Sequence, residues 1–150
     1  MDGFWQSRGG RVLVAALVVG LAAVALAVLI PDRETSDLGG TAWTLVAYGP
    51  AGAPIAAEAL ASISFEANGR FDGFAGCNTF FGNFSAADGQ WEIVDGEIAR
   101  TLADCSADTP AGAQDAFFRQ HMTDGRYTLT ADRLTLYFAD GQIAEYVLAQ

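Results

Sequence analysis

The sequence predicts an α+β domain that is mainly antiparallel β, in which seven or eight short strands form a curved sheet or partly closed barrel with one packed helix. Short segments of alternating apolar and polar residues recur from residue 42 onward. Turn dipeptides such as Asn68-Gly69 and Asp140-Gly141 separate them. Only residues 109–122 carry the capping and spacing of a helix. Many short strands with one helix are typical of an antiparallel sheet that closes toward a barrel.

The first predicted elements are a strand and a hairpin. Residues 42–48 alternate in the manner of a first strand, and residues 49–60 are expected to form a loop that ends in one helical turn. Residues 62–76 contain two short strands around Asn68-Gly69. This dipeptide best suits the positive φ angles of a two-residue hairpin turn, so we expect a tight hairpin here.

Two further strand groups follow the same pattern. Residues 78–94 predict a strand, a turn at Asp88-Gly89 and a second strand. Residues 126–149 predict three strands joined at Ala131-Asp132 and Asp140-Gly141. The side chains that share one face of the middle strand are Leu134, Leu136 and Phe138. The aromatic side chains expected to lie mostly in the core are Phe71, Phe74, Phe80, Phe81 and Phe84.

The predicted helix lies between these groups. Thr109 can cap its N-terminus, and Pro110 suits the first turn, where its missing N–H costs nothing. The residues predicted to share its packed face are Ala113, Ala116, Phe117 and Gln120.

The N-terminal part of the chain has the features of a membrane segment. Residues 12–30 are uncharged and almost wholly apolar, close to the roughly 20 residues that cross a bilayer as a helix. Basic residues precede this run and acidic residues outnumber basic ones after it, which places residues 1–11 in the cytoplasm. The run is a retained signal anchor or, with a small-x-small site at Ala25-Leu26-Ala27, a cleaved signal peptide. Residues 31–40 then read as a linker, and residues 41–150 as an extracytoplasmic domain.

The charge of the exported part excludes one class of partner. Residues 31–150 contain six Arg, no Lys and seventeen Asp plus Glu, a formal net charge of −11. This charge repels the phosphate backbone, so we expect no nucleic-acid binding. It suits a basic protein partner or solubility alone.

The two cysteines form the most distinctive local pattern. Cys77 lies in a Gly76-Cys77-Asn78 turn among phenylalanines and glycines, and Cys105 follows 28 residues later. Outside the cytoplasm two cysteines in one domain often form a disulfide. The alternatives are two buried reduced thiols, or a reactive or metal-binding pair. Zinc needs three or four ligands, and His121 is the chain's single histidine, so we predict no metal site and no cofactor.

Other candidate sites are weaker. A catalytic set would have to combine Cys77 or Cys105 with His121, or Asp72 with Glu66, and nothing in their spacing requires either pairing. We therefore predict no catalytic residues and no enzymatic activity. Four acidic residues lack calcium-loop spacing and are expected to form a solvated edge: Asp88, Glu92, Asp95 and Glu97.

The order of several motifs resembles the META domain family, also called META/HslJ. The matching pieces are Trp43-Thr44-Leu45, Ile63-Ser64-Phe65, Gly76-Cys77-Asn78, Thr101 with Cys105, and the closing Leu134-Thr135-Leu136. The resemblance covers about residues 38–149. It implies a small α+β domain that is often exported in bacteria, often lipid-anchored and sometimes linked with heat-shock or envelope-stress responses. Relatives more often have Met-Ala directly before the second cysteine, whereas Asp104 intervenes here.

Three classes of function follow from these observations. The preferred one is a non-enzymatic domain, membrane-anchored or exported, that binds or supports other components of the cell envelope. The second is an acidic inhibitor of a basic extracellular enzyme such as a lysozyme or protease. The third, an enzyme, lacks a catalytic constellation in the sequence.

Overall fold

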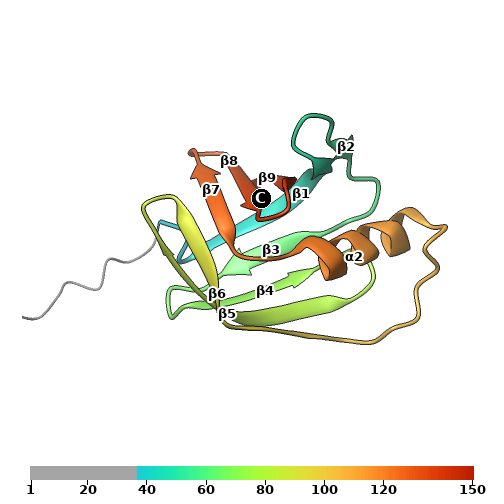
Figure 1. Ribbon diagram of the computed structural model, residues 1–150, viewed down its shortest axis with the longest axis horizontal. Coiled ribbons are helices and arrows are strands. Elements are labelled where there is room, and N and C mark those ends of the chain that lie inside the picture. The colour runs from blue at the N-terminus through green and yellow to red at the C-terminus, as the bar shows by residue number, and fades with distance from the viewer. Residues whose placement is uncertain (1–36) are drawn as a thin grey trace, which may run out of the picture. The chain divides into compact units, whose positions relative to one another are not determined.

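The computed structural model describes residues 37–150, which form a closed antiparallel β-barrel of eight strands with one short extra strand and one helix (Figure 1). The strands are β1 (Thr41–Pro50), β2 (Ile55–Ala56), β3 (Ser62–Phe65), β4 (Arg70–Phe74), β5 (Thr79–Ala87), β6 (Gln90–Arg100), β7 (Gly125–Leu129), β8 (Arg133–Phe138) and β9 (Gln142–Leu148). Their order is β2-β1-β3-β4-β5-β6-β7-β8-β9, and pairing of β1 with β9 closes the barrel. The mainly antiparallel β prediction is thus confirmed, with complete rather than partial closure.

The predicted segments 1–11 and 12–30 lie outside the described residues. Within residues 37–150, no helix is long and apolar enough to cross a membrane. The end of the predicted linker belongs to the fold, because Leu38 is fully buried in the core. The N–H of Gly40 also donates to the carbonyl of Phe65.

The β3–β4 hairpin forms where Asn68-Gly69 predicted it, but with a different turn. The N–H of Glu66 donates to the carbonyl of Arg70, so three residues rather than two form the loop. Gly69 alone in this loop has a positive φ, of 88°. A three-residue loop ends with one residue in the left-handed region, and glycine occupies that position without steric cost.

The β5–β6 turn forms at the predicted Asp88-Gly89, and the structure shows that it has two residues. Asp88 and Gly89 have φ values of 52° and 74°, and Ala87 pairs with Gln90 across them. Two successive positive φ values match the right-handed twist of the flanking strands. The three C-terminal strands are also confirmed, and Leu134, Leu136 and Phe138 are all buried.

The segment between β1 and β3 contradicts its prediction. Residues 49–60 contain no helical turn; Ile55 and Ala56 instead pair with β1 as the short strand β2. Pairing with β1 is the reason, because Ala47 pairs with Ala56 and Tyr48 with Ile55, and this tertiary contact overrides a weak local preference for helix.

The helix α2 (Pro110–His121) has the predicted limits, with the hydroxyl of Thr109 accepting from the N–H of Gly112. Its predicted packed face is only partly right: Phe117 packs against the core and Ala116 is half-buried, but Ala113 and Gln120 are exposed. The buried residues are Gly112, Gln114, Asp115 and Phe118. The buried face includes two polar side chains, so apolar spacing alone could not locate it.

Aromatic side chains fill the barrel. Trp91 forms edge-to-face contacts with Phe65 and Phe71, and Phe80 stacks with Phe118 of α2 at a centroid distance of 6.2 Å. Of the five phenylalanines predicted as mostly core, Phe71, Phe80 and Phe84 are buried, Phe74 is half-buried and Phe81 is exposed. The core therefore joins strands from both halves of the chain to the helix.

Gly73 makes room for this aromatic packing. A Cβ at Gly73 would lie 2.3 Å from the Phe80 ring and 2.5 Å from the carbonyl oxygen of Ser62. We predict that Gly73→Ala lowers the free energy of unfolding by about 2 to 3 kcal/mol, because the core and a backbone carbonyl must shift. Denaturant unfolding followed by circular dichroism measures this. Gly52→Ala is the control, since a Cβ there meets nothing within 4 Å; equal losses in both variants would contradict the packing argument.

Candidate functional site

The Gly76-Cys77-Asn78 motif forms a tight turn between β4 and β5. The N–H of Ala75 donates to the carbonyl of Asn78, and Gly76 has a φ of 110°. A Cβ on Gly76 would lie 3.0 Å from the carbonyl oxygen of Ala111, so only glycine allows helix α2 to approach this closely. The glycine of the motif is thus explained by backbone geometry.

A disulfide joins this turn to the loop that precedes α2. Cys77 and Cys105 are bonded, with Cα atoms 6.4 Å apart and a sequence separation of 28. Of the three alternatives that the sequence left open, the structure contains the disulfide. A bridge over a loop of this length contributes about 3 to 4 kcal/mol by the chain-entropy estimate.

Asn78 is the centre of the hydrogen-bond network beside the disulfide. Its side chain is 5 % exposed. Oδ1 accepts from the N–H of Ala103 at 2.7 Å and from the hydroxyl of Thr101 at 2.9 Å. Nδ2 donates to the carbonyl of Ala103 at 3.3 Å. The amide therefore pairs with both backbone groups of Ala103, as a neighbouring strand would, and holds an irregular loop against the barrel.

Thr101 extends this pairing along β5. Its hydroxyl accepts from the N–H of Thr79 at 3.0 Å, and its own N–H donates to the carbonyl of Thr79. The spacing of Thr101 and Cys105 is thus explained, because these two residues fasten the two ends of one loop. Asp104 is exposed, so the extra acidic residue is accommodated by pointing to solvent.

The third component of the site comes from the helix. Asp115 is 5 % exposed, and its carboxylate accepts from the backbone N–H of Asn78 at 2.9 Å and from Nδ2 at 3.2 Å. Gln114 is fully buried and donates to the carbonyls of Ala59 and Ala75. Sequence reasoning missed both residues. The available signal was a pair of polar residues interrupting the apolar pattern of an otherwise plausible helix.

We call Gly76, Cys77, Asn78, Thr101, Cys105 and Asp115 the Asn78 cluster. All the motif residues predicted from sequence lie in it, and Asp115 is the addition. Its hydrogen-bonding groups are directed at one another, and both sulfurs are bonded. The geometry fits a structural clamp joining strand turn, loop and helix.

A small pocket lies between the clamped loop and the helix. It has a volume of about 250 Å³, and its lining includes Arg100, Leu102, Asp104 and Arg119. The Arg100 guanidinium donates to the carbonyl of Phe118 at 3.0 Å. Burial lowers the pKa of Arg100, while the nearby Asp115 carboxylate opposes that shift and Arg119 adds to it. Arg100 thereby binds a carbonyl in the last turn of α2, where a cation is favourable.

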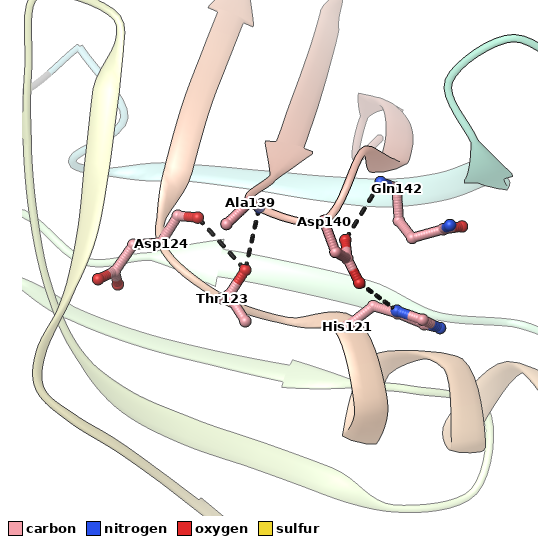
Figure 2. A network of polar contacts seen from close by, with 6 residues as sticks. All are labelled: His121, Thr123, Asp124, Ala139, Asp140 and Gln142. Carbon is pink, nitrogen blue, oxygen red and sulfur yellow. Dashed lines mark hydrogen bonds and ion pairs between the residues drawn. The ribbon is translucent and has the colours of Figure 1, made fainter.

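A second polar network, which includes His121, fixes the C-terminal end of α2 (Figure 2). His121 Nδ1 lies 2.5 Å from Asp140 Oδ2, which connects the helix to the β8–β9 turn. Asp140 Oδ1 accepts from the N–H of Gln142, and the N–H of Ala139 donates to the hydroxyl of Thr123. The hydrogen bond with His121 lowers the pKa of Asp140 below its ordinary value.

The structure does not bring the other predicted pairs together. Within residues 37–150, no hydrogen bond joins His121 to Cys77 or Cys105, and none joins Asp72 to Glu66. Asp72 and Glu66 are both exposed. The four residues expected at a solvated edge are all exposed: Asp88, Glu92, Asp95 and Glu97. In this part of the chain, no group of three or more His, Cys, Asp or Glu residues could hold a metal ion.

Together these features define a small β-barrel domain in which a disulfide and a buried asparagine clamp one helix to the barrel. The family model of the META domain matches residues 36–150, and the chain belongs to this family. A search of curated proteins found no match.

Two solved structures share the fold. An NMR structure of a protein from Burkholderia xenovorans is 21 % identical with a TM-score of 0.59, over 75 % of this chain and 84 % of that one. A second NMR structure is 22 % identical with a TM-score of 0.55, over 73 % of this chain and 91 % of that one.

Replacing Asn78 should weaken the whole clamp. We predict that Asn78→Ala lowers the free energy of unfolding by about 3 kcal/mol, because buried Asp115 loses the Nδ2 donor and both backbone groups of Ala103 lose their partners. Asn83→Ala, at an exposed position, is the control and should change it by less than about 0.5 kcal/mol. A double-mutant cycle with Asp115→Ala should show coupling above about 1 kcal/mol. Additive effects of the two substitutions would mean that the residues are energetically independent.

The pairing of Asp140 with His121 should produce a specific pH dependence. The folded-state pKa of Asp140 is lowered, so its stabilising contribution is present above the unfolded-state pKa and is lost as pH falls through the folded-state value. Because Asp140 is 44 % exposed, we expect Asp140→Asn to cost less than about 1 kcal/mol near pH 5.5. The cost should vanish near pH 2. Denaturant unfolding across this range is the test, with exposed Asp88→Asn as control; an unchanging difference would exclude the linkage.

Proposed function

We propose that this META domain is exported, is held at the membrane by residues 12–30 and binds a protein partner in the cell envelope without acting as an enzyme. The disulfide between Cys77 and Cys105 is the observation that carries this proposal. Structural disulfides persist outside the cytoplasm, and the charges that flank the apolar segment predict the same location for the domain.

The disulfide also argues for binding rather than catalysis. Both thiols are consumed in it, so neither provides the thiolate that a cysteine nucleophile requires. His121 is paired with Asp140 at the far end of α2 from Thr109, away from the clamped loop. The barrel also exposes large apolar side chains, among them Leu60, Phe81 and Leu148, and such side chains suit recognition of another macromolecule.

A second candidate is inhibition of a basic extracellular enzyme. The net charge of −11 over residues 31–150 favours it, since opposite charge accelerates association and improves specificity. Both candidates require export and a protein partner, and they differ in whether that partner loses activity on binding. A role in envelope stress belongs to the first candidate and is expected from the resemblance of the sequence to its family.

Topology and thiol state in bacterial cells test the proposed location. With a C-terminal epitope tag on the full chain, protease added to intact spheroplasts should remove the tag, whereas protease added to unbroken cells should not. Thiol titration of the membrane fraction without reductant should find neither cysteine free. Protection of the tag until spheroplasts are lysed, or two titratable thiols, would overturn the proposal.

Partner binding needs its own experiment in the same cells. A photo-crosslinking residue placed in turn at the exposed positions Leu60, Phe81 and Leu148 should give an adduct with an envelope protein from at least one of them. The same residue at buried Leu136 is the control. Adducts from none of the exposed positions would contradict a stable partner. Adducts followed by activity assays of the captured protein would separate a binding role from an inhibitory one.

A further inference from the structure

The outer surface of β5 and β6 carries a groove that the clamp does not use. It has a volume of about 540 Å³, and its lining includes Phe81, Asn83, Val94, Asp95 and Glu97. None of these residues belongs to the Asn78 cluster or to the core.

An irregularity in β6 creates the groove. Gly82 pairs with Ile98, and Phe84 pairs with Ile93. An advance of two residues along β5 therefore lies opposite an advance of five residues along β6. The extra residues turn sharply at Asp95 and Gly96, which have φ values of 60° and 66°. A non-glycine residue in the left-handed region is uncommon and needs a structural explanation. Here the consequence is that Val94 to Glu97 form a raised rim.

Gly82 lets the floor of the groove lie close to this rim. A Cβ at Gly82 would lie 2.9 Å from the carbonyl oxygen of Glu97 and equally close to the Phe71 ring. The backbone of β5 at Gly82, which forms the floor of the groove, therefore packs directly onto the core. The groove follows from the packing of the barrel wall itself.

Apolar side chains are exposed at the groove. Phe81 is 46 % exposed and Val94 is 39 % exposed. Neighbouring exposed apolar side chains with a polar rim are typical of protein-binding surfaces. An aromatic residue is also the kind of side chain that most often dominates the energy of an interface.

The charge of the groove selects its occupant. Asp95 and Glu97 line it, their carboxylates make no hydrogen bond or ion pair with any described residue, and no Arg lines it. A partner bearing Lys or Arg would therefore pair with carboxylates that are otherwise solvated, whereas an acidic partner would be repelled. Residues 31–150 as a whole carry a formal net charge of −11, which adds to this selection.

We propose that this groove binds a basic protein segment, in which an apolar side chain contacts Phe81 and Val94 while flanking Lys or Arg side chains pair with Asp95 and Glu97. The inference rests on the proposed partner-binding function and adds the surface and the chemistry of the partner.

A short fluorescent peptide with one central Phe flanked by Lys residues is the probe. Its binding to the full chain in neutral detergent micelles is measured by fluorescence anisotropy at low salt. The double variant Asp95→Asn/Glu97→Gln and the single variant Phe81→Ser should each bind about 10-fold more weakly, a loss of the size expected for a central contact. Asn is tolerated in the left-handed region, so the turn at Asp95 is preserved.

The matched control removes the same charge elsewhere. Asp88→Asn/Glu92→Gln changes two exposed acidic residues on the same hairpin, and Asp88 also has a positive φ. This control should bind the peptide within about 2-fold of the original chain, with the small residual effect expected for distant screened charges. Raising the salt concentration should weaken binding to the original chain more than binding to Asp95→Asn/Glu97→Gln.

Three results would overturn the inference: no binding to the original chain, equal weakening by both double variants, or equal binding of a peptide whose Phe is replaced by Ser. Failure here is separable from failure of the proposed function. If crosslinking in cells captures an envelope protein from Leu60 or Leu148 but not from Phe81, the partner exists and the groove does not bind it.

Discussion

The side-chain amide of Asn78 is the interaction on which the organisation of the domain depends. It pairs with both backbone groups of Ala103, and its donor side also reaches the Asp115 carboxylate. One buried side chain thus joins a strand turn, a loop without regular structure and a helix. An irregular loop has unpaired backbone groups that must find partners when they approach a core. Asn78 supplies them in the geometry that a neighbouring strand would.

The disulfide and the hydrogen bonds contribute to this clamp differently. The Cys77–Cys105 bond acts mainly by restricting the unfolded chain, and it fixes which loop lies beside which turn. The hydrogen bonds of Asn78 and Asp115 act in the folded state and fix orientation, because each group has few alternatives once buried. Gly76 is needed by both, since a side chain there would separate the helix from the turn.

The Asn78 cluster is tightly packed, whereas the pairing of β5 with β6 in the barrel wall is irregular. Extra residues in β6 raise a rim of Val94 to Glu97 above the sheet without disturbing the core beneath it. The features that stabilise the fold and the groove proposed to bind a partner therefore lie in different parts of the molecule. The clamp uses buried polar groups that satisfy one another, and the groove exposes apolar and charged groups that do not.

The residues alone predicted much of the local structure: all strand segments except β2, the position of the turn at Asp88-Gly89, the limits of α2 and its Thr109 cap. Alternation, turn chemistry and capping act over a few residues, so they can be recognised without knowing the fold. The sequence also identified the motif residues, but it left open whether Cys77 and Cys105 form a disulfide. Only the tertiary structure decided that β1 closes on β9, which face of α2 is buried, and that Asp115 binds Asn78 across 37 residues. A helix face is chosen by what it meets, and here a polar turn met Gln114 and Asp115 where an apolar stripe was expected.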